Sequence, residues 1–127
     1  MKAISEARRY LSNARALLRE KARKEDGYYQ DIKYVRMAGH TAYAGVLVAL
    51  DSFLGSKKKG RKSVEWYAGK LATLDRRALN IFVALYDTLH LSLGYDGNPS
   101  AKIARDGLED ADALVDWIES RMAVTKV

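Results

Sequence analysis

The stretch YVRMAGHTAYAGVLVALDSFL, residues 34–54, decides the fold because it reads as a helix that is apolar around most of its circumference. At 100° per residue its apolar positions cover more than half of the helix surface, so the helix must contact several neighbours. Four small residues lie along one side of it: Ala38, Ala42, Gly45 and Ala49. Each helical glycine costs roughly 1 kcal/mol relative to alanine, and close packing of another backbone has to offset that cost. We therefore predict a central, tightly packed helix over residues 28–54.

The remaining flank of this helix is less polar than a side that faces water should be. A second apolar stripe on a helix that already serves the core indicates a second interface, with either a fifth helix or another subunit. Of these two we favour a symmetric homodimer. Its predicted interface consists of Met37, Thr41, Ala44 and Val48.

The rest of the chain divides into helices at clear turn signals. Residues 3–23 carry apolar residues at spacings of three and four, and EDG at 25–27 ends that helix. A helical pattern over 63–93 begins at Ser63, a good N-cap, and Asp75 is a second N-cap that indicates a break near 73–75. After the turn GYDGNPS at 94–100, Asn98 and Pro99 predict the start of the last helix, which extends to about residue 122.

The fold class follows from these elements. One proline in 127 residues, and the absence of alternating β-branched runs, favour an all-helical protein. Long amphipathic helices with short connections favour antiparallel neighbours. We predict a single all-α domain over residues 1–127, a four-helix up-and-down bundle whose third helix is broken into two.

Composition excludes several classes of chemistry. The chain has no cysteine, which excludes disulfides, thiolate catalysis and cysteine-based zinc sites and is compatible with a reducing cytosol. The charged amphipathic start does not resemble a signal peptide, and no uncharged apolar run is long enough to span a membrane. We expect a cytoplasmic protein that carries no cofactor and no metal.

Charge is distributed unevenly along the chain, whose net charge is +6. Residues 1–62 hold 15 Lys or Arg against 6 Asp or Glu, whereas residues 63–127 hold 7 against 10. The basic part can bind an acidic partner, or the two parts can pair with each other, which is the more common outcome for helical surfaces. The basic first helix and the acidic last helix are therefore expected to lie side by side.

Two pairs of residues are candidates for chemistry. Arg36 and His40 are four residues apart on one helix and can form an anion-binding pair, although a place at the core edge explains them more simply. Asp87 and His90 are three apart, with Tyr86 beside them, so a carboxylate can orient the imidazole for acid–base catalysis. A nucleophile is missing there, and the alternative we favour is a helix end at which the histidine binds carbonyl groups. Two histidines alone are a weak metal signal.

The segment KKKGRK, residues 57–62, holds five positive charges in six residues. Such a loop can contact the phosphates of RNA or DNA, with nearby tyrosines as stacking surfaces, or it can simply keep the protein soluble. No glycine-rich phosphate loop is present, because the motif's ending is absent. The nucleic-acid-binding candidates are Lys57, Lys58, Lys59, Arg61 and Lys62.

Three segments together resemble the HEPN superfamily of small helical bundles, and the whole chain also resembles a small uncharacterised bacterial family with this bundle. They are RMAGHTAYAGVLVALDSFL, YDTLHLSLGYDG and NPSAKIARDGLEDADALVDWIESRM. The resemblance implies dimerisation through helices and, in some members, a nucleotidyltransferase partner. It also implies, in some members, a ribonuclease activity that needs an arginine and a histidine with four to six residues between them. Here the comparable histidine is His90. The positions at that separation before it are Val83, Ala84 and Leu85, and none of them is an arginine, so the motif is absent.

Two hypotheses follow. The first is a non-enzymatic, dimeric HEPN-like module that binds a protein or a nucleic acid. The second is a divergent enzyme that acts on RNA or a nucleotide and is centred on His90.

Overall fold

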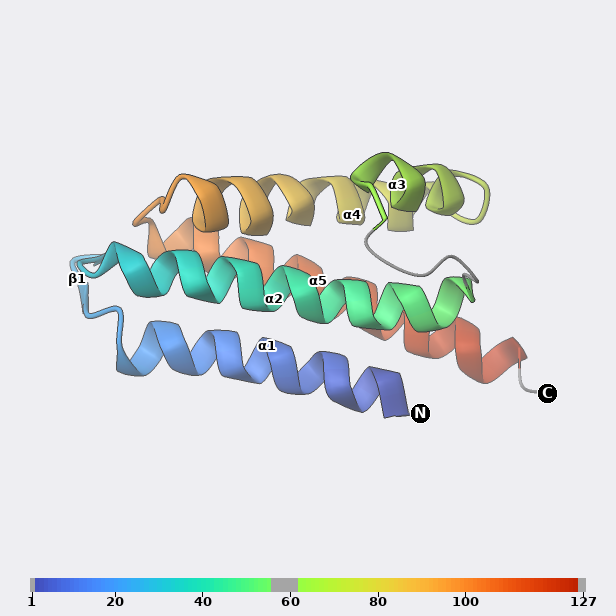
Figure 1. Ribbon diagram of the computed structural model, residues 1–127, viewed down its shortest axis with the longest axis horizontal. Coiled ribbons are helices and arrows are strands. Elements are labelled where there is room, and N and C mark those ends of the chain that lie inside the picture. Colours follow the sequence, from blue (N-terminus) through green and yellow to red (C-terminus); the bar gives the residue numbers. More distant parts are fainter. Residues whose placement is uncertain (1, 56–61, 126–127) are drawn as a thin grey trace.

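A computed structural model describes residues 2–55 and 62–125 of the chain (Figure 1). The described residues are mostly helical, as predicted, and their elements follow in this order: α1 Lys2–Glu20, β1 Lys24–Glu25, β2 Tyr28–Tyr29, α2 Ile32–Leu54, α3 Val64–Ala72, α4 Arg76–Leu85, the π-helical η1 Tyr86–Tyr95, and α5 Ala101–Thr125. The long helices lie alongside one another, and η1 continues α4 (Figure 1). No helix in these described ranges is long and apolar enough to cross a membrane.

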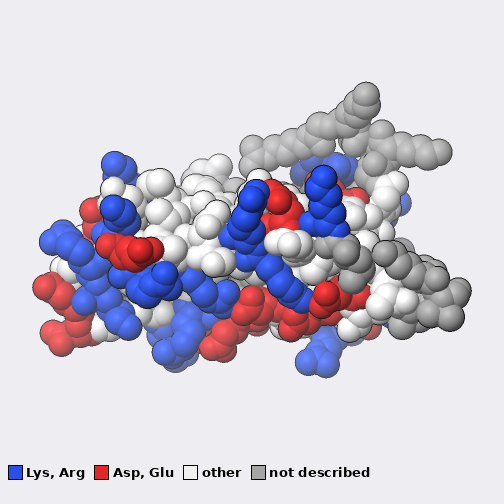
Figure 2. Space-filling model, turned by 90° about the horizontal axis from the view of Figure 1, so that it is seen from below, with Lys and Arg blue, Asp and Glu red and all other residues white. Residues whose placement is uncertain are grey.

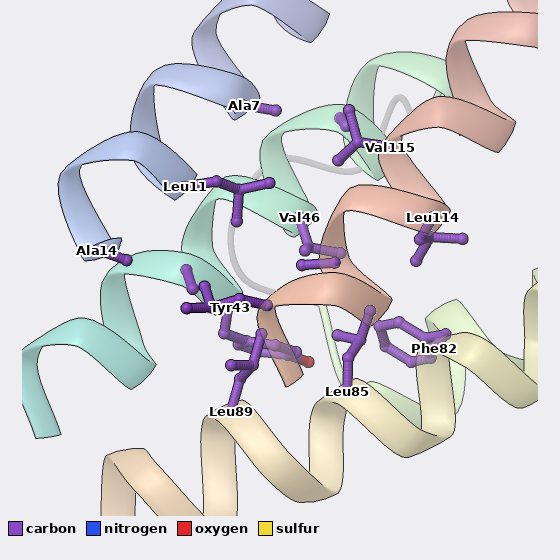
Figure 3. Packing of buried hydrophobic residues seen from close by; sticks show 14 of the residues in the cluster. Ala7, Leu11, Ala14, Tyr43, Val46, Phe82, Leu85, Leu89, Leu114 and Val115 are labelled. Atoms are coloured by element: carbon purple, nitrogen blue, oxygen red, sulfur yellow. The ribbon is translucent and has the colours of Figure 1, made fainter. Parts of the chain in front are cut away.

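The core lies where the predicted apolar stripes meet. Every residue of the predicted stripe is buried: Ile4, Ala7, Leu11, Ala14 and Leu18 of α1, and Ala22, which follows the helix because α1 ends at Glu20 and not at residue 23. Figure 3 shows Ala7, Leu11 and Ala14 of this stripe facing the side chains of α2 and α5, with Phe82, Leu85 and Leu89 on the other side of the core. Apolar residues spaced three and four positions apart lie on one side of a helix, so a helix can bury all of them against the core.

Helix α2 is the central helix, as the opening stretch predicts. It contacts α1, η1 and α5. A side-chain carbon added at Gly45 would lie 2.6 Å from Cβ of Tyr10, and one at Gly39 would lie 2.5 Å from the carbonyl oxygen of Leu89. The two glycines therefore allow α1 and η1 to approach α2 closely.

A small β-hairpin precedes α2, which corrects the prediction of a helix that begins at residue 28. Glu25 pairs with Tyr28 in a two-stranded antiparallel sheet, and Tyr28 also bridges to Ser100 before α5. The turn uses positive φ angles at Asp26 (52°) and Gly27 (83°). The EDG signal was correct as a turn, but the chain reverses into a strand before the helix starts at Ile32.

The predicted break in the third helix is confirmed, and both N-caps are in place. The Ser63 side chain accepts a hydrogen bond from the Trp66 amide at 3.1 Å. The Asp75 carboxylate accepts one from the Ala78 amide at 2.9 Å and begins α4. Each cap satisfies an amide that lacks a partner within its own helix.

The start of the last helix differs from the prediction. Helix α5 begins at Ala101, and Ser100 is its capping residue, with Oγ accepting from the Ile103 amide at 3.3 Å. Asn98 instead accepts from the Ser100 amide at 3.0 Å, and the Pro99 carbonyl accepts from the Tyr29 amide at 2.8 Å. The hairpin holds residues 98–100 in the turn, so the helix starts later than the Asn-Pro signal indicates.

Opposite charges of α1 and α5 pair across the surface, as expected from the uneven charge distribution. Arg8 lies 3.0 Å from Asp116 and 2.7 Å from Glu119, and Arg15 lies 2.6 Å from Asp112. Figure 2 shows the resulting contact of blue and red side chains along this face. Because these groups are partly exposed, each pair contributes at most about 1 kcal/mol.

Candidate functional site

A groove of about 420 Å³ lies between α2, η1 and the segment that leads into α3. Aromatic and histidine rings form much of its lining, which consists of Tyr43, Leu47, Lys62, Ser63, Val64, Tyr86, His90 and Tyr95. Its volume is in the range of small-molecule sites. We refer to it below as the aromatic groove.

His90 is at the centre of the ring cluster. Its ring centroid lies 4.8 Å from that of Tyr43, 5.2 Å from that of Tyr86 in a stacked arrangement, and 5.2 Å from that of Tyr95. His40 adds a fifth ring at 5.6 Å from His90. These separations are typical of favourable aromatic contacts. The cluster is therefore an ordered platform rather than a set of unrelated side chains.

The π-helical geometry of η1 helps to place these rings. The Asp96 amide donates to the Leu91 carbonyl five residues earlier, at 2.9 Å. A π-helix has a wider turn than an α-helix. Tyr86, His90 and Tyr95 therefore lie on one side of the same segment, and all three line the groove. The apolar periodicity of this segment is also compatible with an α-helix, so the π-helix could not be predicted from the sequence.

In the structure, the candidate residues of α2 lie beside η1, which carries the other candidate residues. His40 of α2 packs on Gly94 of η1, where an added side-chain carbon would lie 2.6 Å from Cε1 of His40. Arg36, one turn earlier, passes Gly97, where an added carbon would lie 3.0 Å from Nε. Glycine at both positions lets the predicted Arg36 and His40 pair lie against the end of η1 and the turn after it, which brings His40 next to His90.

The predicted acid–base residues separate in the structure. Tyr86 and His90 line the groove, but Asp87 is exposed on η1 and is not part of the lining. Tyr95, which closely follows these residues in the sequence, also lines it, and so does Tyr43 of α2, which the sequence did not connect with His90. The lining of the groove therefore consists more of aromatic and histidine rings than of charged groups that could act in catalysis.

Lys62 occupies a structural position at one end of the groove. Its side chain is only 7% exposed, and its Nζ lies 3.2 Å from Oδ1 of Asp51. The same oxygen accepts the Tyr67 hydroxyl at 2.6 Å, and the Trp66 ring lies 5.5 Å from the ammonium group. Its predicted partners in nucleic-acid binding, Lys57, Lys58, Lys59 and Arg61, are outside the described residues.

The predicted dimer residues follow one outer strip of α2. Met37 is 43% exposed, and Thr41, Ala44 and Val48 are half-buried within one chain. Over residues 2–55 and 62–125, no three His, Cys, Asp or Glu side chains lie close enough together to hold a metal ion.

These features define a small, mostly helical protein with a ring-lined groove beside its central helix. Residues 2–120 match the model of a family described as a domain of unknown function (DUF5618), and the chain belongs to that family. A solved structure of a protein of unknown function from Dyadobacter fermentans is similar to it, with 50% sequence identity and a TM-score of 0.89. That similarity covers 95% of this chain and 96% of the other. A comparison with curated proteins found no match.

Proposed function

We propose that the protein is a non-enzymatic, homodimeric binding module with a HEPN-like four-helix up-and-down bundle, and that its aromatic groove binds single-stranded nucleic acid. The ring cluster around His90 is the observation that carries this proposal. Proteins that bind single strands without base pairing combine stacking platforms with cationic surfaces. The groove and its neighbourhood contain both features.

The stacking platform is available to a ligand at one end. Tyr95 is 64% exposed and packs edge-on against both His40 and His90. Tyr86 stacks on His90. An unpaired base has two flat faces and can extend this series of rings without any need for a particular sequence.

Arg36 supplies positive charge near the platform, and the sequence adds basic residues next to the groove. Arg36 is exposed beside Gly97. In the sequence, the basic segment KKKGRK directly precedes Ser63, which lines the groove. A phosphate backbone that follows the rings would therefore have the Arg36 guanidinium as a cationic contact, and the basic segment is a second candidate that its place in the chain suggests.

Replacing Tyr95 with alanine is expected to weaken the binding of a short, labelled single-stranded RNA by about tenfold, because stacking contributes roughly 1–3 kcal/mol per base. Tyr95 is mostly exposed, so its removal should leave the fold intact. Fluorescence anisotropy at low and moderate salt measures the affinity, and circular dichroism checks the fold.

Tyr28 provides the matched control, since it is also an exposed tyrosine (56%) but lies on β2, outside the groove. Tyr28→Ala should change the affinity less than twofold. Equal losses in the two variants, or no binding of RNA and single-stranded DNA by the wild type, would refute the proposal. In the latter case a protein partner, such as a nucleotidyltransferase, becomes the better hypothesis.

The alternative function is an RNA- or nucleotide-acting enzyme, and the contact between His40 and His90 favours it. Two imidazoles whose centroids are 5.6 Å apart are close enough to act on one substrate as an acid and a base. Under this alternative, His90→Ala abolishes turnover of an RNA or nucleotide substrate. Under the binding proposal, wild type and variant show the same absence of turnover.

The dimer proposal predicts that Val48→Asp gives a folded monomer. Val48 belongs to the outer strip of α2 with Met37, Thr41 and Ala44, and a carboxylate buried between subunits is costly. Light scattering measures the mass. Val83→Asp is the control, because Val83 is an exposed apolar residue (50%) on α4. A dimer that persists in the Val48 variant places the interface elsewhere.

A further inference from the structure

A second pocket, of about 400 Å³, lies where the end of α1, the hairpin and the start of α5 meet. It shares no lining residue with the aromatic groove. Figure 2 shows Lys and Arg side chains gathered toward the end of this face that carries the hairpin. We refer to it below as the cationic pocket.

Four cationic side chains from three elements line the cationic pocket: Arg15 and Arg19 of α1, Lys24 of β1 and Arg105 of α5. Arg15 is held by Asp112 at 2.6 Å, and Arg19 lies 3.6 Å from Glu20. Within the part of the chain that the structure describes, Lys24 and Arg105 form no ion pair. The pocket therefore has more positive charge than its neighbours neutralise, which favours an anionic ligand.

The remaining lining is mostly apolar and includes one further hydrogen-bond donor. Leu18 and Leu108 are almost fully buried, with exposed fractions of 4% and 5%, and they form an apolar floor. Tyr29 also lines the pocket, and burial raises the pKa of its hydroxyl group, which therefore stays protonated and can donate. The amino-terminal end of the 25-residue helix α5 contributes Ala101, where the helix dipole is positive.

We propose that the cationic pocket binds a phosphorylated small organic molecule of nucleotide size. Arginine guanidinium groups match phosphate oxygens in geometry as well as in charge. Arg15 and Arg19 of α1 and Arg105 of α5 line this pocket, and Arg105 is the one of the three without an ion pair among the described residues. The apolar floor then accommodates the organic part of the ligand. The pocket volume is in the range that such molecules occupy. This site is independent of single-strand binding in the aromatic groove.

Isothermal titration calorimetry with two probes, ATP and inorganic tripolyphosphate, tests this proposal. The double substitution Arg19→Gln and Arg105→Gln should weaken ATP binding by at least about tenfold, because two charge-assisted contacts are lost. The matched control is Arg76→Gln with Arg77→Gln, which removes two exposed arginines of α4 outside the pocket and should change the affinity less than twofold. ATP should bind more tightly than tripolyphosphate because only ATP can use the apolar floor.

Three results would overturn the proposal. One is an absence of ATP binding at low salt, and another is an equal loss in the two double variants, which indicates general charge attraction. The third is displacement of ATP by single-stranded RNA together with a weakened RNA affinity in the Arg19 and Arg105 variant, which assigns these cations to a nucleic-acid backbone. A failure of the Tyr95 experiment leaves this proposal unaffected, because the two sites share no residue.

Discussion

Replacing Gly39 with alanine is expected to lower the free energy of unfolding by about 2 kcal/mol, as the difference between two opposing effects. An added side-chain carbon would lie 2.5 Å from the carbonyl oxygen of Leu89, 2.7 Å from the Gly94 amide nitrogen and 2.7 Å from Cβ of Leu93. Two of these atoms belong to the backbone of η1, so relief requires the whole segment to move. Overpacking of this kind costs about 1–3 kcal/mol, here at the upper end, and alanine returns roughly 1 kcal/mol of helix propensity.

Gly69 is a control in which the same substitution should have the opposite sign. It is exposed in α3, and a carbon added there meets no atom within 4 Å. Gly69→Ala should therefore raise stability by up to about 1 kcal/mol through helix propensity alone. Chemical denaturation measures both changes, and thermal unfolding should show a decrease of roughly 8 °C for the Gly39 variant. A Gly39→Ala variant as stable as the wild type would mean that η1 does not pack closely on α2.

The helices could be predicted from the sequence because the residues that they bury recur every three or four positions. The stripe from Ile4 to Leu18 is buried as predicted, and the small residues of α2 face their neighbours. The caps at Ser63 and Asp75 were predictable since each depends on one side chain and a nearby amide. These are local rules that apply before any distant contact is known.

The position of the hairpin beside the start of α5, and the aromatic groove, depend on contacts between distant segments, which periodicity does not encode. Tyr28 pairs locally with Glu25, but it also bridges to Ser100, about seventy residues later in the chain. His40 and His90 come together because Gly94 and Gly39 let η1 approach α2. The glycine and histidine positions were visible in the sequence, but the π-helical register that aligns them was not.

Replacing Asp51 with alanine is expected to destabilise the protein by about 3 kcal/mol, because it leaves a buried ammonium group without its carboxylate. Oδ1 of Asp51 accepts hydrogen bonds from both Lys62 and the Tyr67 hydroxyl, and the Lys62 side chain is only 7% exposed. Removing one partner of a buried pair costs about 3–5 kcal/mol, and the partial exposure of Asp51 (43%) places this case at the lower end. Urea denaturation of the single variant measures the loss.

A double-mutant cycle with Lys62→Met separates the buried charge from the other contacts of Asp51. Methionine keeps an apolar stem near Trp66 without the charge, so this variant alone should change stability by less than about 1 kcal/mol. In the double variant no ammonium group remains to be neutralised, and at least about 1 kcal/mol of the Asp51 loss should be recovered. Losses that simply add would show that Lys62 is not coupled to Asp51. In that case Lys62 would be available for the phosphate contact considered in the sequence analysis. Strong coupling would mean that Lys62 stabilises the start of α3, so that other cationic residues would have to contact the nucleic acid.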